Sequence, residues 1–101
     1  MNSQTMTMVR IYLSEESAHL EKLLTLLCDV EKVKGVTVFR GIAGCGDSGK
    51  VHTASMVDLS MSLPIVVEFF DVPETIEGII DHLHTNIKPG HIVSWPVNVR
   101  V

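Results

Sequence analysis

The hydrophobic residues of this chain are spaced in a way that predicts alternating strands and helices. Residues 6–13 form an apolar run with β-branched side chains, as expected for a first strand. Leucines then recur at helical spacing, which predicts a first helix that continues toward Val30 and is closed by Gly35. Residues 36–42 form a second apolar run and predict a second strand. The leucines of the helical face are Leu20, Leu23, Leu24 and Leu27.

The second half of the chain repeats this order. Residues 57–63 alternate apolar and polar side chains, and residues 63–70 continue as an apolar strand with Pro64 near its start. Asp71, Pro73 and Glu74 are signals for the start of a helix. Alternation resumes from residue 91 to residue 101 and predicts the last strand. The second helical face consists of Ile76, Ile79, Ile80, Leu83 and Ile87, and the helix ends at Lys88-Pro89-Gly90.

The predicted order is βαββαβ, the split βαβ pattern of a ferredoxin-like α+β fold in which helices cover one sheet face. One domain accounts for residues 1–101. Several strand residues with the opposite parity to the core-facing ones are also large and apolar, which indicates that something covers the second face. Packing of sheets between subunits is the simplest cover, and a 46% apolar fraction agrees with oligomerisation. These residues are Met6, Met8, Tyr12, Val66 and Phe70.

Composition narrows the classes of function. A formal net charge of −4 provides no basic field, so nucleic acid is not an expected partner. No apolar stretch is long enough for a membrane span, and the N-terminus lacks the features of a signal peptide. The two cysteines suggest neither a disulfide framework nor a four-ligand zinc site. We therefore expect a cytoplasmic protein with reduced thiols.

The segment from Arg40 to Ala54 carries four glycines, two basic residues, a histidine and a cysteine. Its pattern Gly44-x-x-x-x-Gly49-Lys50 matches a Walker A motif except that Val51 replaces the Mg²⁺-binding hydroxyl. The same glycines, with Asp71, match a dinucleotide fingerprint. Both motifs need a helix immediately afterwards, whereas residues 51–63 have strand spacing, so both are disfavoured. A ligand-free hairpin and a phosphate-contacting loop remain, and the length of the connection favours the second.

Other chemistry is sparsely indicated. His82 and His84 lie two apart on a helix and cannot chelate one ion together. No nucleophile with its base and no carboxylate pair stands out, so no catalytic residue is predicted. Arg10 lies among apolar strand residues and needs a partner, either a carboxylate such as Glu68 or an anionic ligand. Trp95 is expected in the core or in an interface.

Four segments together resemble a bacterial PII-like family, domain of unknown function 190. They are Val9-Arg10-Ile11-Tyr12-Leu13, Thr37-Val38-Phe39-Arg40-Gly41-Ile42-Ala43-Gly44 with Gly46, Val51-His52-Thr53-Ala54, and Leu63-Pro64-Ile65-Val66-Val67-Glu68. The resemblance runs from about Met8 to Val101. It implies a homotrimer of the PII superfamily that binds an adenine nucleotide or a related effector between subunits, with no enzymatic activity and no cofactor.

By the same resemblance, residues 41–62 correspond to the T-loop, which engages a partner protein such as a membrane channel or transporter. Lys88-Pro89-Gly90 resembles the second ligand-contacting loop. The modifiable tyrosine of classical PII proteins has no counterpart, since the single tyrosine is Tyr12. The expected effector-binding residues are Arg40, Gly41, Gly44, Gly46, Lys50, His52, Lys88 and Gly90.

Two other interpretations stay open. A metal-responsive trimer of the divalent-cation-tolerance type shares this architecture and would bind Cu²⁺ or Zn²⁺ through Cys45 or His52. Nucleotide hydrolysis at residues 44–50 would require Mg²⁺, and Val51 argues against it.

Overall fold

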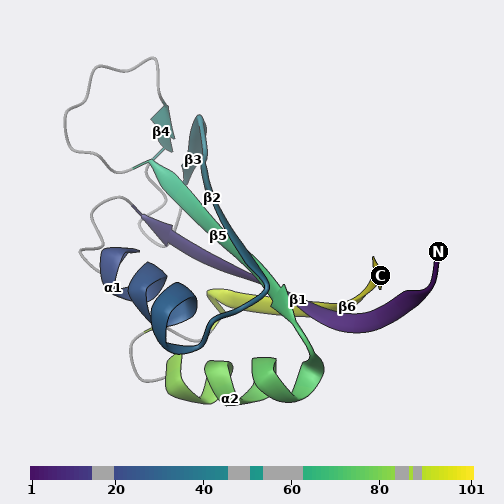
Figure 1. Ribbon diagram of the computed structural model, residues 1–101. Coiled ribbons are helices and arrows are strands. Elements are labelled where there is room, and N and C mark those ends of the chain that lie inside the picture. Colours follow the sequence, from purple (N-terminus) through teal and green to yellow (C-terminus); the bar gives the residue numbers. More distant parts are fainter. Residues whose placement is uncertain (15–19, 46–50, 54–62, 84–86, 88–89) are drawn as a thin grey trace.

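The computed structural model describes residues 1–14, 20–45, 51–53, 63–83, 87 and 90–101. Four strands form one sheet in the order β2-β5-β1-β6, and all neighbours are antiparallel. Both helices lie on one side of this sheet (Figure 1). The elements are β1 (Ser3–Ser14), α1 (Leu20–Thr25), the π-helical turn η1 (Leu26–Val30), β2 (Gly35–Arg40), β3 (Ala43–Cys45), β4 (Val51–Thr53), β5 (Pro64–Asp71), α2 (Pro73–Leu83) and β6 (Ile92–Arg100). The predicted ferredoxin-like α+β fold is therefore confirmed.

The core lies between the helices and the inner face of the sheet. Alternate residues of β5 are buried, as the pleat of a strand with one face on the core requires. Phe69 of β5, Ile76 of α2 and Leu27 of η1 are completely buried. Apolar burial of this kind provides most of the stabilising free energy of a small domain. The buried cluster is Val9, Ile11, Leu23, Leu27, Ile65, Val67, Phe69, Ile76, Ile79 and Leu83.

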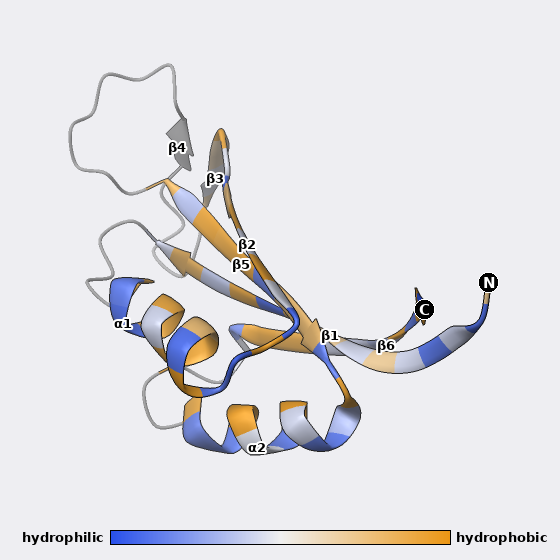
Figure 2. Ribbon diagram, in the orientation of Figure 1, coloured by the Kyte–Doolittle hydropathy of each residue, from blue (hydrophilic) through white to orange (hydrophobic). Residues whose placement is uncertain are grey.

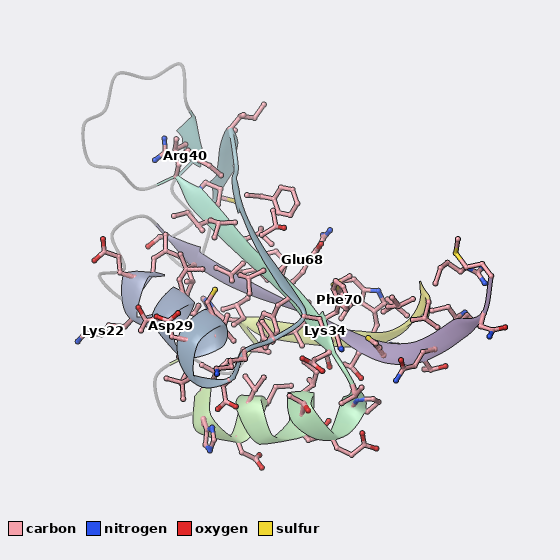
Figure 3. The ribbon with its side chains drawn as sticks, viewed as in Figure 1. Lys22, Asp29, Lys34, Arg40, Glu68 and Phe70 are labelled. Atoms are coloured by element: carbon pink, nitrogen blue, oxygen red, sulfur yellow. The ribbon has the colours of Figure 1, made fainter. Side chains whose placement is uncertain are left out.

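Among the described residues no helix lies on the outer face of the sheet, and this face is rich in large side chains. Figure 3 shows Glu68 and Phe70 of β5 on the side that faces away from both helices. Figure 2 shows that β5 is hydrophobic along most of its length, although its residues alternate between the two faces. Trp95 of β6 is 38% exposed, and Tyr12 of β1 is 40% exposed. The prediction that the strands are apolar on both faces is confirmed.

The first helix differs from its predicted course. It is α-helical only over Leu20–Thr25 and continues as the π-helical turn to Val30. Lys32, at φ 51°, takes the left-handed conformation after the turn, and Gly35 is already part of β2. The prediction that Gly35 closes the helix was wrong because a lysine occupies the left-handed position three residues earlier.

Two further differences concern the connection between β2 and β5 and the end of the second helix. The short strands β3 and β4 pair with each other in a separate two-stranded sheet, which the hydrophobic spacing did not predict. The strand predicted over residues 57–63 lies mostly outside the described residues. Helix α2 ends at Leu83, and the Ile87 N–H still donates to the Leu83 carbonyl at 3.2 Å. Within the described residues, no helix has the length and hydrophobicity that a bilayer crossing requires.

Candidate functional site

The connection that was predicted to bind an effector leaves the sheet at the end of β2 and returns at the start of β5. Arg40 is still paired with Ile65, and the next pair is Gly41 with Pro64. The Gly41 N–H donates to the Pro64 carbonyl at 2.7 Å, but proline has no N–H to return. The β2–β5 ladder therefore ends on half of a pair, and the chain separates from the sheet here.

Beyond this point the chain forms a second ladder. Ala43–Cys45 of β3 pair with Val51–Thr53 of β4, and Gly44 lies opposite His52. The residues that follow the glycine motif are therefore in a strand and not in a helix. This excludes the helix N-terminus that both the Walker A and the dinucleotide interpretations require. Gly46 and Lys50, two of the predicted site residues, lie outside the described residues.

Asp71, the acidic residue of the disfavoured dinucleotide interpretation, has a structural role. Its side chain is 7% exposed and accepts the Val72 N–H at 2.7 Å and the Lys34 N–H at 3.2 Å. It thus joins the segment before β2 to the start of α2. A carboxylate held by two backbone donors inside the fold is not presented to a ribose.

The second predicted loop reaches the sheet through Gly90 and His91. Gly90 has φ +86°, a conformation that glycine adopts without strain. The Tyr12 N–H donates to the His91 carbonyl at 2.9 Å, and His91 Nδ1 lies 3.1 Å from the Tyr12 carbonyl oxygen. These bonds fix the start of β6 beside the end of β1. Lys88, the predicted cation of this loop, lies outside the described residues.

The strand register places the two loops at the same end of the sheet but at opposite edges. His91 lies beside Tyr12, Tyr12 is paired with Val66, and Val66 is paired with Phe39. Arg40 and Gly90 each lie one residue further toward the same end. Three strand spacings, or about 14 Å, separate the β2 edge from the β6 edge. A single copy of the chain therefore does not bring Arg40 and Gly90 onto one small group.

Arg10 and Glu68 form an ion pair on the outer face of the sheet. The Arg10 Nε donates to Glu68 Oε2 at 2.6 Å, and the two side chains are 42% and 21% exposed. The Arg10 guanidinium also lies 5.6 Å from the centroid of the Trp95 ring, within the range of a cation–π contact. The hydrogen bond with Glu68, with a smaller contribution from Tyr12, raises the pKa of Arg10. The predicted carboxylate partner of Arg10 is therefore confirmed.

Sequence reasoning missed the role of Pro64 at the stem of the loop and the bonds of His91 at the opposite edge of the sheet. Pro64 was assigned only to the start of a strand, although it contacts both Gly41 and Gly44. The hydrogen bonds that His91 makes with Tyr12 at the start of β6 were not predicted either. The signal was available in the sequence, because antiparallel pairing of the predicted second strand with the strand that begins near Pro64 places this proline opposite the glycines that follow Arg40. Among the described residues, no group of three or more His, Cys, Asp and Glu is placed to hold a metal ion.

Several solved structures share this fold over almost the whole chain. CPII from Thiomonas intermedia K12, solved with ADP and bicarbonate, is 20% identical, with a TM-score of 0.70 over 97% of this chain and 91% of that one. A putative PII-like signalling protein from Thermus thermophilus is 20% identical, with a TM-score of 0.68 over 100% of this chain and 93% of that one. CutA1 from Oryza sativa is less similar, at 12% identity and a TM-score of 0.61 over 98% and 84%. These likenesses establish a PII-like fold.

Curated relatives are closer in sequence. A UPF0166 protein from Methanocaldococcus jannaschii is 30% identical over 84% of this chain and 82% of its own length. A UPF0166 protein from Aquifex aeolicus is 34% identical over 91% of this chain and 94% of its own. A family model described as "Uncharacterized ACR, COG1993", or DUF190, matches residues 6–99. The chain therefore belongs to this DUF190 family, as its sequence motifs predicted, and it has a PII-like fold.

Proposed function

We propose that this protein is a non-enzymatic PII-like regulator that assembles as a trimer and binds an adenine nucleotide between subunits. One observation carries the proposal. The loop stem at Arg40 and Gly41 and the turn at Gly90 are at the same end of one sheet but at its opposite edges. A ring in which the β2 edge of one copy meets the β6 edge of the next would place these loops together. Cyclic assemblies make such heterologous contacts.

The chemistry of the loops suits a small anion. Arg40 is exposed at the end of β2 and would provide charge-assisted hydrogen bonds, together with Lys50 and with Lys88 of the adjacent copy. Gly44, Gly46, His52 and Gly90 would complete the site. Gly41 would act through its contact with Pro64, since its N–H already donates to that residue. CPII, which shares the fold, was solved with ADP and bicarbonate, and this supports an adenine nucleotide as the effector.

Residues 41–62 would then convey the bound state to a partner protein, a membrane channel or transporter. The β3–β4 ladder pairs two parts of this segment, and Gly41 at its start bonds to Pro64, so the base of the segment would lie near the proposed effector site. Binding of a nucleotide at the stem would change which arrangement of the segment is populated, and so change its affinity for the partner.

The test is a calorimetric titration of the purified protein with ATP, ADP, AMP and cyclic AMP, with and without Mg²⁺. We expect saturable binding near one nucleotide per chain. Arg40→Ala should weaken binding by about tenfold through loss of charge-assisted bonds. Arg100→Ala is the matched control, because Arg100 is exposed on β6 at the opposite end of the sheet. It should leave the affinity unchanged.

A site between subunits also predicts that two defective variants can complement each other in a mixed trimer. Co-assembly of Arg40→Ala chains with Lys88→Ala chains would create, in each mixed ring, one site with both native residues. Tight binding should therefore return at one of the three sites of each mixed ring, although neither parent variant binds well. Absence of heat with every nucleotide contradicts the proposal. Saturable Zn²⁺ or Cu²⁺ binding that disappears in Cys45→Ser would then favour the metal-responsive alternative.

A further inference from the structure

Pro64 is in unusually close contact with two glycines of the candidate site. A Cβ atom added to Gly41 would lie 2.5 Å from the Pro64 Cγ and 3.3 Å from the Pro64 carbonyl oxygen. A Cβ atom on Gly44 would lie 3.1 Å from the same Cγ. Neither glycine needs the left-handed conformation, since Gly90 alone among the described glycines has a positive φ. The closeness of the proline ring leaves no space for a side chain at position 41 and little space for one at position 44.

The proline also determines where the loop begins. The residues of β5 that bond to β2 are the even-numbered ones, because the Pro64 carbonyl accepts the Gly41 N–H and antiparallel pairs alternate along the ladder. Any other residue at position 64 could return an N–H to the Gly41 carbonyl and extend the ladder by a full pair. Proline cannot, so the chain separates there. Its ring instead packs against Gly44 and so joins β3 to β5.

We propose that Gly41, Gly44 and Pro64 form a clasp and that Pro64 is the positioning residue of the loop. The clasp fixes the direction in which the β3–β4 hairpin leaves the sheet. Gly41 and Gly44, which resemble a ligand-binding motif in the sequence, thus provide the space in which the Pro64 ring packs. The effect on nucleotide binding rests on the proposed function, whereas the clasp itself does not.

Two explanations for Gly41, contact with the Pro64 ring and contact with a nucleotide, predict different effects of Gly41→Ala when residue 64 is changed to alanine. If Gly41 is needed because a nucleotide approaches its backbone, Gly41→Ala is harmful whatever stands at position 64. If it is needed because the Pro64 ring occupies the space, Pro64→Ala removes the 2.5 Å contact with Cγ, keeps the 3.3 Å contact with the backbone carbonyl oxygen, and so suppresses most of the destabilisation caused by Gly41→Ala. Gly44→Ala should be suppressed in the same way but cause a smaller defect, because its added Cβ is farther from the ring.

The experiment measures thermal stability and loop mobility in this set of variants. Gly41→Ala should lower Tm by about 4 °C or more when Pro64 is present and by much less when residue 64 is alanine. A nitroxide on Cys45, an exposed free cysteine in β3, should become more mobile in Gly41→Ala and regain its parental spectrum in Gly41→Ala/Pro64→Ala. All labelled proteins carry Cys28→Ser so that only Cys45 reacts.

Two glycines serve as matched controls. An added Cβ at Gly78 or at Gly90 would meet nothing within 4 Å. Gly78→Ala, in α2, should not lower Tm. Gly90→Ala should lower Tm because of its positive φ, and Pro64→Ala should not suppress that loss. Equal damage from Gly41→Ala in both backgrounds, or a Cys45 label as mobile in the parent as in Gly41→Ala, would overturn the clasp.

Nucleotide titration then separates the two proposals. In a parent that binds ADP, Gly44→Ala should weaken ADP binding several-fold, and Pro64→Ala should restore part of the loss. A suppression pattern in Tm and label mobility without any ADP binding by the parent would support the clasp and reject the proposed function. ADP binding that Gly44→Ala leaves unchanged, although the Cys45 label is loosened, would overturn the positioning role.

Discussion

At the residue scale, Asp71 is the polar group on which local order most depends. It is almost fully buried and accepts two backbone N–H groups, one from Val72 and one from Lys34. A buried donor that loses its acceptor costs about 1–3 kcal/mol. Asp71→Ala should therefore lower the free energy of unfolding by about that amount, as measured by chemical denaturation at a fixed protein concentration.

Exposed carboxylates provide the comparison for Asp71. Glu77 is exposed on α2, and Glu77→Gln should change the free energy of unfolding by no more than about 0.5 kcal/mol. A loss in Asp71→Ala as small as in this control would mean that the Val72 and Lys34 N–H groups find other acceptors. The backbone bonds of Asp71 would then not stabilise the fold.

Single residues also show where sequence reasoning succeeds. An arginine among strand residues requires a partner for its charge, and Glu68 could be named because the two strands were both predicted. The role of Asp71 could not be predicted, because its donors come from two segments that only the tertiary fold brings together. The positions of Gly41 and Gly44 suggested a ligand, whereas a distant proline in the sequence fills the space beside them.

At the element scale, the end of the first helix contains the one non-glycine residue with a positive φ among those described. The Glu31 N–H donates to the Leu26 carbonyl at 2.8 Å, and the Val33 N–H donates to the Leu27 carbonyl at 3.0 Å. Lys32 lies between them at φ 51°. A non-glycine residue in this conformation costs roughly 1 kcal/mol or more.

Replacing Lys32 by glycine should relieve this strain. We expect Lys32→Gly to raise the free energy of unfolding by up to about 1 kcal/mol, measured as a higher Tm. Lys34→Gly is the control, since Lys34 is also exposed and has no positive φ. It should give no gain. A Tm that falls in Lys32→Gly as much as in Lys34→Gly would show that the left-handed turn carries no strain.

Most helices and strands were predictable, because the spacing of apolar residues in the sequence reflects which side chains face the core. The apolar run of residues 63–70 predicts a strand, and within it Ile65, Val67 and Phe69 are buried on the face that meets the core. The change from α- to π-helix after Thr25 was not predictable, since both forms bury Leu23 and Leu27 on one face. The β3–β4 hairpin has three residues in each strand, too few to show a period.

At the scale of the whole molecule, the outer face of the sheet exposes large apolar side chains that another subunit could bury. It carries Tyr12, Phe39 and Trp95, each more than a third exposed, around the Arg10–Glu68 ion pair. Apolar strands on both faces are typical of sheets that are covered on both sides. The proposed trimer would provide this cover, and the ion pair would then lie inside the assembly.

Burial in an interface changes what the ion pair contributes. An exposed pair has little effect, so its removal from a free surface would leave assembly unchanged. A pair enclosed by neighbouring subunits behaves differently, because removing one partner leaves an uncompensated charge away from water. Replacing both partners by apolar residues of similar size avoids that penalty. The contrast between single and double variants therefore reports whether this face is covered.

We accordingly expect Arg10→Met, which leaves Glu68 without its cation, to weaken assembly by at least about tenfold. Arg10→Met/Glu68→Leu should recover most of the loss, and sedimentation equilibrium over a range of protein concentrations measures both. Lys22→Met on α1, on the helical side of the molecule, is the control for removing one exposed cation (Figure 3). If Arg10→Met assembles like this control, the subunits meet elsewhere. A ring built on the two sheet edges would then have to leave the aromatic face open to water, which its exposed apolar area makes unfavourable.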